Sequence, residues 1–236
     1  MKIMVINPNS SVDMTNHIRK ALEVIKRPET ELTVTCPDKG PVAIESAYDE
    51  MLAAFYSMDL VKRANKDNFD AVIIACFSDP GLAAMKEVSD ILVVGIQEVS
   101  LHIAAMLGHK FTILTSAKER IPSKYVNVWR NKLPFNLASV RDLGMTVTET
   151  DKKPDLAQKH ILEVARQAIE EDGAEVIILG CAGMAGYAEK VAKELNIVVI
   201  DPTLVAFKYA EAMVEAGIKQ SKRALYAHPS EKEYKV

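Results

Sequence analysis

The sequence predicts an α/β protein with two similar lobes, each a parallel sheet covered by helices. Short apolar runs rich in Val and Ile alternate with longer amphipathic segments, and features of the first half recur in the second. Continuous apolar runs are typical of strands that are buried on both faces, which occur mainly in parallel sheets. Alternation of such strands with helices is the pattern of α/β folds.

Seven apolar runs are expected to form strands, because they have strand length and are bounded by polar or turn residues. The runs cover residues 2–7, 32–36, 71–76, 91–96, 111–115, 175–181 and 196–200. Between them, residues 49–64 and 156–171 carry apolar side chains at helical spacing, which predicts a helix in each segment.

Three pairs of segments relate the two halves of the chain, and each is a strand followed by a turn and the start of a helix. The pairs are KIMVINPNS (2–10) with KFTILTSAK (110–118), VIIAC (72–76) with IILGC (177–181), and VVGIQEVSLHIA (93–104) with VVIDPTLVAFKY (198–209). They occur in the same order at offsets of 108, 105 and 105 residues. Two copies indicate a duplication and not a longer repeat array. We therefore expect two Rossmann-like lobes related by pseudo-two-fold symmetry.

The predicted lobes follow from this duplication. The first lobe comprises residues 1–97 together with a returning C-terminal segment, 206–236, and the second comprises residues 98–205. Ligands of parallel sheets bind beyond the carboxyl ends of the strands. Two facing lobes place those ends on either side of one cleft, which is the predicted active site.

Composition excludes several classes of function. The 236 residues are 49% apolar and 26% charged with a net charge of −3, which is ordinary for a soluble globular protein and gives no basic footprint for nucleic acid. No run approaches the roughly 20 apolar residues of a membrane span, and the start, MKIMVINPNSS, does not have the form of a signal peptide. We expect a cytoplasmic protein with reduced thiols, a small-molecule substrate, and neither nucleic-acid nor membrane partners.

Two cysteines, Cys76 and Cys181, occupy equivalent positions directly after matching strands. Each precedes a turn that can start a helix, where backbone N–H groups favour negative charge and lower the pKa of a thiol. One thiolate can remove a proton from a carbon while the opposite thiol returns a proton to the other face. The pair therefore indicates a racemisation or epimerisation that requires no cofactor.

The alternative for each cysteine is a small buried apolar residue, which is the commoner role of a lone cysteine. The matched positions of Cys76 and Cys181 favour catalysis, whereas Cys36 has no counterpart and is interpreted as structural. The three cysteines include no CxxC pair, so no metal site is predicted.

Other residues at the strand ends are candidates for substrate binding. Ser10 or Ser11 is expected to cap the helix after the first strand. The turns after the two cysteines present backbone amides that can hold an anionic oxygen. The predicted substrate-binding residues are Asn7, Phe77, Ser78, Thr115, Ser116, Ala182 and Gly183.

Five motifs carry a resemblance to a known family. They are NPNSSVDMT (7–15), AIESAYDE (43–50), ACFSDPGL (75–82), LGCAGMAG (179–186) and VIDPT (199–203). Together they resemble the aspartate/glutamate/hydantoin racemase superfamily, and within it the hydantoin and allantoin racemase branch. This resemblance implies a two-lobed α/β fold with a central cleft, a homo-oligomer, no cofactor, and a 1,1-proton transfer by Cys76 and Cys181. Glu45 looks like part of the family's Ile-Glu pair and is interpreted as a packing or helix-capping residue.

The neighbours of the cysteines favour a neutral cyclic ureide as substrate, either a 5-substituted hydantoin or a relative such as allantoin. Aspartate and glutamate racemases look like Cys-Asn-Thr and Cys-Thr-His here, whereas this chain has Cys-Phe-Ser (76–78) and Cys-Ala-Gly (181–183). A free amino acid brings a carboxylate and an ammonium that need paired groups in a desolvated site. A ureide presents only amide groups.

Two alternatives remain open. A racemase of a free amino acid such as aspartate or glutamate needs a carboxylate-binding Arg or Lys in the cleft, and Lys118 and Arg120 are candidates to supply that charge. A non-catalytic small-molecule binding protein on the same scaffold would keep its ligand affinity when either Cys76 or Cys181 is replaced by Ser.

Overall fold

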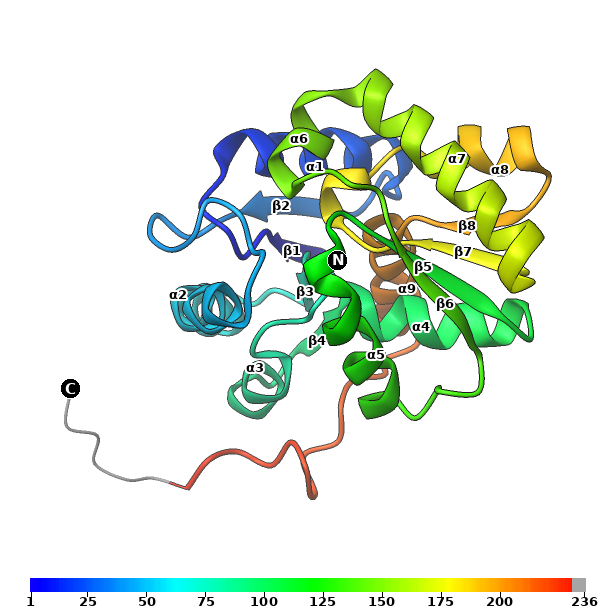
Figure 1. Cartoon of the computed structure of the whole chain (residues 1–236). Helices are drawn as coiled ribbons and strands as arrows, with labels where there is room; N and C mark the ends of the chain where they lie inside the picture. The colour runs from blue at the N-terminus through cyan, green and yellow to red at the C-terminus, as the bar shows by residue number, and fades with distance from the viewer. Residues whose placement is uncertain (231–236) are drawn as a thin grey trace.

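The computed structural model describes residues 1–230, and in this part the strands form two separate parallel sheets (Figure 1). The sheet orders are β2-β1-β3-β4 and β6-β5-β7-β8. The strands are β1 Lys2–Ile6, β2 Glu31–Thr35, β3 Ala71–Ile74, β4 Leu92–Gly95, β5 Phe111–Thr115, β6 Leu137–Asp142, β7 Val176–Leu179 and β8 Val198–Ile200. The second sheet repeats the order of the first, which confirms the prediction of two similar α/β lobes.

Each of the seven apolar runs contains a strand, but the sequence reading missed β6. This strand has the sequence LASVRD, and only its Val140 is fully buried. β6 lies at the edge of the second sheet and pairs with β5 alone. An edge strand need not be apolar on both faces, so its sequence lacks the pattern that predicted the others.

The central strands are buried on both faces, because helices cover each side of each sheet. In β1, Ile3 and Val5 belong to one apolar core, while Met4 and Ile6 belong to another on the opposite face. Successive side chains of a strand point to opposite faces, so both sets are apolar. This double burial explains the continuous apolar runs in the sequence.

The helices follow the strands in regular alternation. They are α1 Val12–Ile25, α2 Ala47–Lys66, α3 Leu82–Val88, α4 Ile96–Leu107, η1 Lys118–Arg120, α5 Ile121–Arg130, α6 Val147–Lys152, α7 Pro154–Asp172, η2 Ala182–Met184, α8 Ala188–Leu195 and α9 Pro202–Glu215. The helices predicted at 49–64 and 156–171 lie within α2 and α7, and Ser11 caps α1 by accepting from Met14 N at 3.2 Å. No helix of the described chain is long and apolar enough to cross a bilayer.

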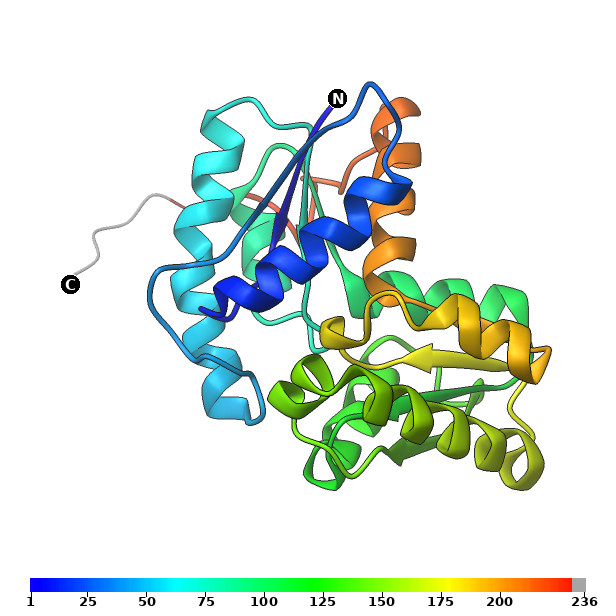
Figure 2. The ribbon, with the colours of Figure 1, turned by 90° about the horizontal axis from the view of Figure 1, so that it is seen from above.

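Helices α4 and α9 join the two lobes. Helix α4 follows the first sheet but packs on β7 and β8 of the second, whereas α9 follows the second sheet and packs on α1, β3 and β4 of the first. The two helices also pack against each other, and Figure 2 shows the end of α9 meeting α4 at a steep angle where the two lobes join. One apolar core therefore extends through both lobes, including Ile73 from β3, Phe207 from α9 and Ile178 from β7.

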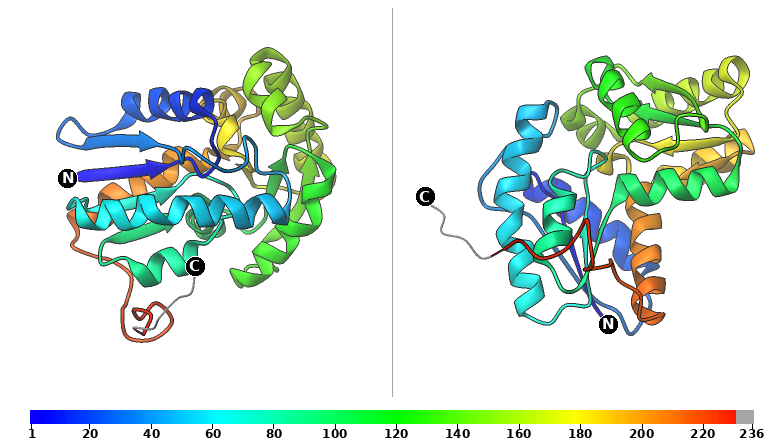
Figure 3. Two further views of the ribbon diagram at one scale, coloured as in Figure 1. Left: turned by 90° about the vertical axis from the view of Figure 1, so that its left-hand side faces the viewer. Right: turned by 90° about the horizontal axis from the view of Figure 1, so that it is seen from below.

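The lobe boundaries predicted at 97/98 and 205/206 fall inside α4 and α9, and that division stays a prediction. The last six residues of the predicted first lobe, 231–236, lie outside the part of the chain that the structure describes. The segment after α9 returns along the first lobe (Figure 3). There Gln220 accepts from Val93 N at 3.0 Å and donates to Ile91 O at 2.7 Å, so its side chain covers the open edge of β4.

A carboxylate anchors the start of each joining helix. Asp79, in the loop after β3, accepts from Gln97 N at 3.0 Å and Glu98 N at 2.8 Å, at the start of α4. Asp201 caps α9 and also accepts from Gly186 N, in the loop after β7, at 2.7 Å. Each carboxylate thus ties a loop that follows a cysteine to a joining helix. Burial, reinforced by the charge of Glu98, raises the pKa of Asp79 to about 7.

We expect Gly180→Ala to destabilise the protein by about 1–3 kcal/mol, the usual cost of overpacking. A Cβ at Gly180 would lie 2.5 Å from the carbonyl oxygen of Leu114, so β5 and β7 would have to separate. Urea unfolding measures the change. Gly183→Ala is the matched control, because its Cβ would come no closer than 3.6 Å to Cys181 Sγ, and it should stay within about 0.5 kcal/mol of wild type. Equal stabilities for the two variants would contradict this packing.

Candidate active site

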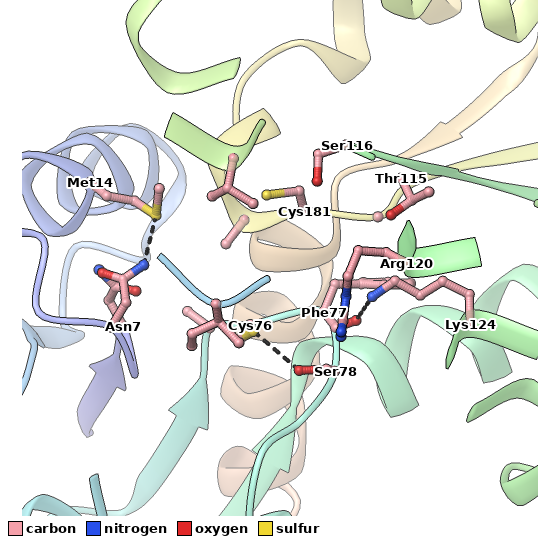
Figure 4. A pocket seen from close by; sticks show the side chains of 16 residues that line it. Asn7, Met14, Cys76, Phe77, Ser78, Thr115, Ser116, Arg120, Lys124 and Cys181 are labelled. Atoms are coloured by element: carbon pink, nitrogen blue, oxygen red, sulfur yellow. Dashed lines mark hydrogen bonds between the residues drawn. The ribbon is translucent and has the colours of Figure 1, made fainter. Parts of the chain in front are cut away.

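A cavity lies between the lobes, where the carboxyl ends of β1, β3, β5 and β7 meet (Figure 4). These are the two central strands of each sheet. The cavity is lined by Asn7, Asn9, Met14, Ile44, Ala75, Cys76, Phe77, Ser78, Thr115, Ser116, Arg120, Lys124, Val147, Gly180, Cys181 and Ala182. All of the predicted site residues except Gly183 are in this set, so the fold brings them together as the duplication suggested. Their roles in binding and catalysis stay predictions.

The Cys76 thiol enters the cavity from the first lobe. Its sulfur lies 3.4 Å from the Ser78 hydroxyl. The expected helix start is absent here, because Cys76 is followed by a turn and α3 begins only at Leu82. Burial therefore dominates and raises the pKa of the Cys76 thiol, against the opposing effects of the Ser78 hydrogen bond and the positive charge of Lys124. The structure therefore indicates a raised pKa for the Cys76 thiol, opposite to the lowering expected from the sequence.

The Cys181 thiol enters from the second lobe, on the opposite side of the cavity from Cys76 in Figure 4. Here the predicted helix start is present, as the short 3-10 turn η2. Cys181 occupies the N-cap position of η2, and its sulfur accepts from Gly183 N at 3.4 Å. Gly183 thus contacts the sulfur without lining the cavity. The two lobes present their thiols through different turns, although the strands before them correspond.

Asn7 is held by a network that fixes the direction of its side-chain amide. Its Nδ2 donates to Asn9 Oδ1 at 2.7 Å and to Thr15 Oγ1 at 3.0 Å. The remaining atom, Asn7 Oδ1, is buried and has no hydrogen-bond partner in the structure. A buried polar atom without a partner is unfavourable, so Asn7 Oδ1 is a candidate acceptor for a group bound in the cavity that Asn7 lines.

Two cationic side chains from the second lobe line the cavity. Arg120 forms an ion pair with Glu50 and donates to Glu45 O at 3.3 Å, so its charge is compensated. Lys124 donates to the Phe77 carbonyl oxygen and lies 5.1 Å from the centre of the Phe77 ring. Of the two residues that the sequence offered as a source of charge, Arg120 lines the cavity, whereas Lys118 is exposed and outside it.

The sequence reading missed Lys124. The residue belongs to no motif, and it lies within α5, beyond the turn that follows β5. Its spacing of four residues from Arg120 was the one available signal, because positions i and i+4 share a face of a helix.

The first lobe closes over the cavity through the loop before α2. Glu45 Oε1 accepts from Val147 N at 3.0 Å, at the start of α6 in the second lobe. Next to these residues, Ile44 and Val147 both line the cavity. Glu45 is therefore a helix-capping residue, as the sequence allowed, but the helix that it caps belongs to the other lobe.

Within residues 1–230, no three His, Cys, Asp or Glu side chains are grouped so that they can hold a metal ion. The chemistry available in the cavity is that of two thiols, several hydroxyl and amide groups, and two cations.

The model of the Asp/Glu/Hydantoin racemase family matches residues 3–210, which include strands β2 to β8 and all of β1 except Lys2. The chain belongs to this family. A hydantoin racemase from Pseudomonas sp. (strain NS671) is 38% identical over 237 aligned positions, covering 99% of this chain and 94% of that protein. A hydantoin racemase from Paenarthrobacter aurescens is also 38% identical and covers 99% of this chain and 100% of its own length.

A solved structure gives the same relationship. The allantoin racemase from Klebsiella pneumoniae superposes with a TM-score of 0.96 at 32% identity, covering 100% of this chain and 96% of that one. The resemblance found in the sequence motifs is thereby confirmed, as is the two-lobed fold that it implied.

We expect the Cys76 thiol to titrate above its ordinary pKa of about 8.5, because burial disfavours the thiolate. The measurement is the ultraviolet absorbance of the thiolate against pH in a Cys36→Ser, Cys181→Ser double variant. The matching triple variant, which also lacks Cys76, provides the baseline. A midpoint below about 8.5 would show that the Ser78 and Lys124 contacts outweigh burial.

Proposed function

We propose that this family member is a cofactor-independent racemase of 5-substituted hydantoins or a related cyclic ureide such as allantoin. Its family and its full-length relatives make it a racemase, and hence an isomerase. The substrate class follows from what those relatives are named for. The observation that carries the mechanism is the pair of thiols on opposite sides of one cavity, one from each lobe.

In the proposed reaction one proton leaves one face of C5, and another proton is added to the opposite face of the flat intermediate. A cysteine thiolate removes the proton from C5 of the ring, and the electron pair of the broken C–H bond passes into the adjacent carbonyl as an enolate. The opposite thiol then donates its proton to the other face of C5 and becomes a thiolate. Cys76 and Cys181 exchange the roles of base and acid for the two enantiomers.

The charges around the cavity favour a ureide over a free amino acid. Arg120 and Lys124 meet the requirement for a cation in the cleft, which is the observation that favours an amino acid substrate. However, Arg120 is already paired with Glu50, and no described lining residue is an Asp or Glu. An α-ammonium would therefore enter a buried site beside cations with no anionic side chain to receive it. A ureide carries no ammonium.

Asn7 offers the complementary polar contact. Asn9 and Thr15 accept from Nδ2 and so fix the orientation of the side-chain amide. The unpartnered atom is therefore Oδ1, which can accept a hydrogen bond but not donate one. A cyclic ureide presents N–H groups on its ring, and we assign one of them to Asn7 Oδ1. Thr115, Ser116, Ser78 and the Ala182 turn form the rest of the proposed polar wall.

The protein is further proposed to act in the cytoplasm as a homo-oligomer. An exposed apolar stripe on α2 supports self-association, since Tyr48, Met51 and Phe55 lie on one side of the helix and are each about 70% exposed. Such spacing places the three side chains on one helical face.

Cys76→Ser and Cys181→Ser should each lower racemisation at least about 100-fold, because a hydroxyl is a much weaker acid than a thiol. The assay follows optical rotation and deuterium entry at C5 of an enantiopure 5-substituted hydantoin in deuterium oxide. Cys36→Ser, which lies outside the cavity, should retain wild-type activity.

Full activity in either cavity variant would refute the two-cysteine mechanism. Exchange at Cα of aspartate or glutamate, with none at C5 of a hydantoin or allantoin, would favour the amino acid alternative. Unchanged ligand affinity in both variants, with no exchange in wild type, would favour a binding protein.

Methylation of one ring nitrogen of the substrate should weaken binding to wild type about tenfold or more, because a buried acceptor then loses its partner. Asn7→Ala should bind the methylated and unmethylated rings with affinities within about threefold, since it lacks that acceptor. Calorimetry with the two N-methyl isomers of one hydantoin measures both. Equal discrimination in wild type and Asn7→Ala would show that another group contacts the ring N–H.

A further inference from the structure

Lys124 is a buried lysine without a carboxylate partner. The residue is only 4% exposed, and its ammonium donates to the neutral Phe77 carbonyl. Among the described residues, no carboxylate lies within ion-pair distance of this ammonium. Burying an ammonium costs several kcal/mol unless an opposite charge compensates it. One hydrogen bond to a neutral carbonyl does not offset that cost, so the burial of Lys124 indicates a further role.

The Phe77 carbonyl does not depend on Lys124. Gln97 Nε2 also donates to that oxygen at 2.9 Å, and Gln97 is itself buried. An ammonium has three N–H donors, and the contact with Phe77 uses one of them. Because Lys124 lines the cavity together with both thiols, its remaining donors are available to a molecule bound there.

We propose that Lys124 is a catalytic residue that binds the carbonyl oxygen next to the reacting carbon and stabilises the negative charge developed on that oxygen. This inference rests on the proposed function. The proton leaves C5 for a thiolate, the electron pair moves onto the oxygen held by Lys124, and the opposite thiol supplies the returning proton. One negative charge therefore passes from sulfur to oxygen to sulfur, and Lys124 balances it at each stage.

The surroundings of Lys124 suit this role. Burial lowers the pKa of the Lys124 ammonium below its ordinary value; Cys76 opposes this, Arg120 adds to it, and Cys181 and Glu50 oppose it. Both thiols thus act on the same cation, although they come from different lobes. In a site withdrawn from water, a fixed positive charge stabilises a developing anion more strongly than it does in solution.

Two other donors beside the cavity are already engaged. Arg120 is held by Glu50 and the Glu45 carbonyl, and the Gly183 N–H is donated to Cys181 Sγ. From the sequence, the turns after the cysteines were expected to stabilise the anion, and the structure offers the Lys124 ammonium of α5 in addition.

The test compares Lys124→Met, which keeps the length of the side chain and removes its charge, with Lys124→Arg, which keeps the charge. Lys118→Met is the control, since Lys118 is exposed and outside the cavity. Deuterium entry at C5 gives kcat and KM. Calorimetry gives the affinity for barbiturate, a planar ring whose negative charge is shared by its carbonyl oxygens, and for uncharged uracil.

We expect Lys124→Met to lower kcat about 100- to 1000-fold, the usual effect of removing one donor to an oxyanion, with KM within a few-fold of wild type. It should also lose the wild-type preference for barbiturate over uracil. Lys124→Arg should keep part of the wild-type kcat and part of the preference for barbiturate. Lys118→Met should match wild type in both measurements.

Wild-type exchange in Lys124→Met would overturn the inference and leave the proposed function intact. So would a loss of exchange with an unchanged preference for barbiturate, because Lys124 would then have a structural role only. If neither Lys124 variant folds, the wild type still decides, since barbiturate that binds no tighter than uracil overturns the inference. Absence of C5 exchange in wild type, with any of these ureides, overturns the proposed function and this inference with it.

Discussion

The packing of α4 against α9 is the interaction on which the rest of the structure depends. Each helix leaves one sheet and packs on the other, so the two lobes share one apolar core and cannot be treated as independent units. Asp79 and Asp201 anchor the helix starts to the loops that follow β3 and β7. Since Cys76 and Cys181 lie in those loops, the same contacts that join the lobes also position the two thiols.

The cavity between the lobes combines groups that are unfavourable when buried alone. It holds a cation without an anion at Lys124, an acceptor without a donor at Asn7, and a thiol whose pKa is raised at Cys76. The proposed ureide substrate and its enolate would supply a negative oxygen to Lys124, an N–H to Asn7 and the C5 proton to the thiolate of Cys76. The stability lost by burying them is consistent with a site organised around an intermediate.

Most of the fold and much of the site could be predicted from the sequence, and the failures have physical causes. The central strands were recognisable because both of their faces are buried, whereas β6 was missed because an edge strand tolerates Arg141 and Asp142. The cysteines were recognisable because they follow matching strands. Lys124 was missed because its α5 position gives no sign of which side chains it meets.

The sequence by itself determined the alternation of strands and helices, the duplication, and the equivalence of Cys76 and Cys181, since all three are recorded in local patterns and their spacing. Only the tertiary structure decided the rest. The exchange of α4 and α9 between lobes, the capping of α6 by Glu45, and the approach of Lys124 to Phe77 join residues far apart in the chain. The electrostatics of the cavity depend on those contacts, because burial and the distances between charges exist only once the lobes are packed.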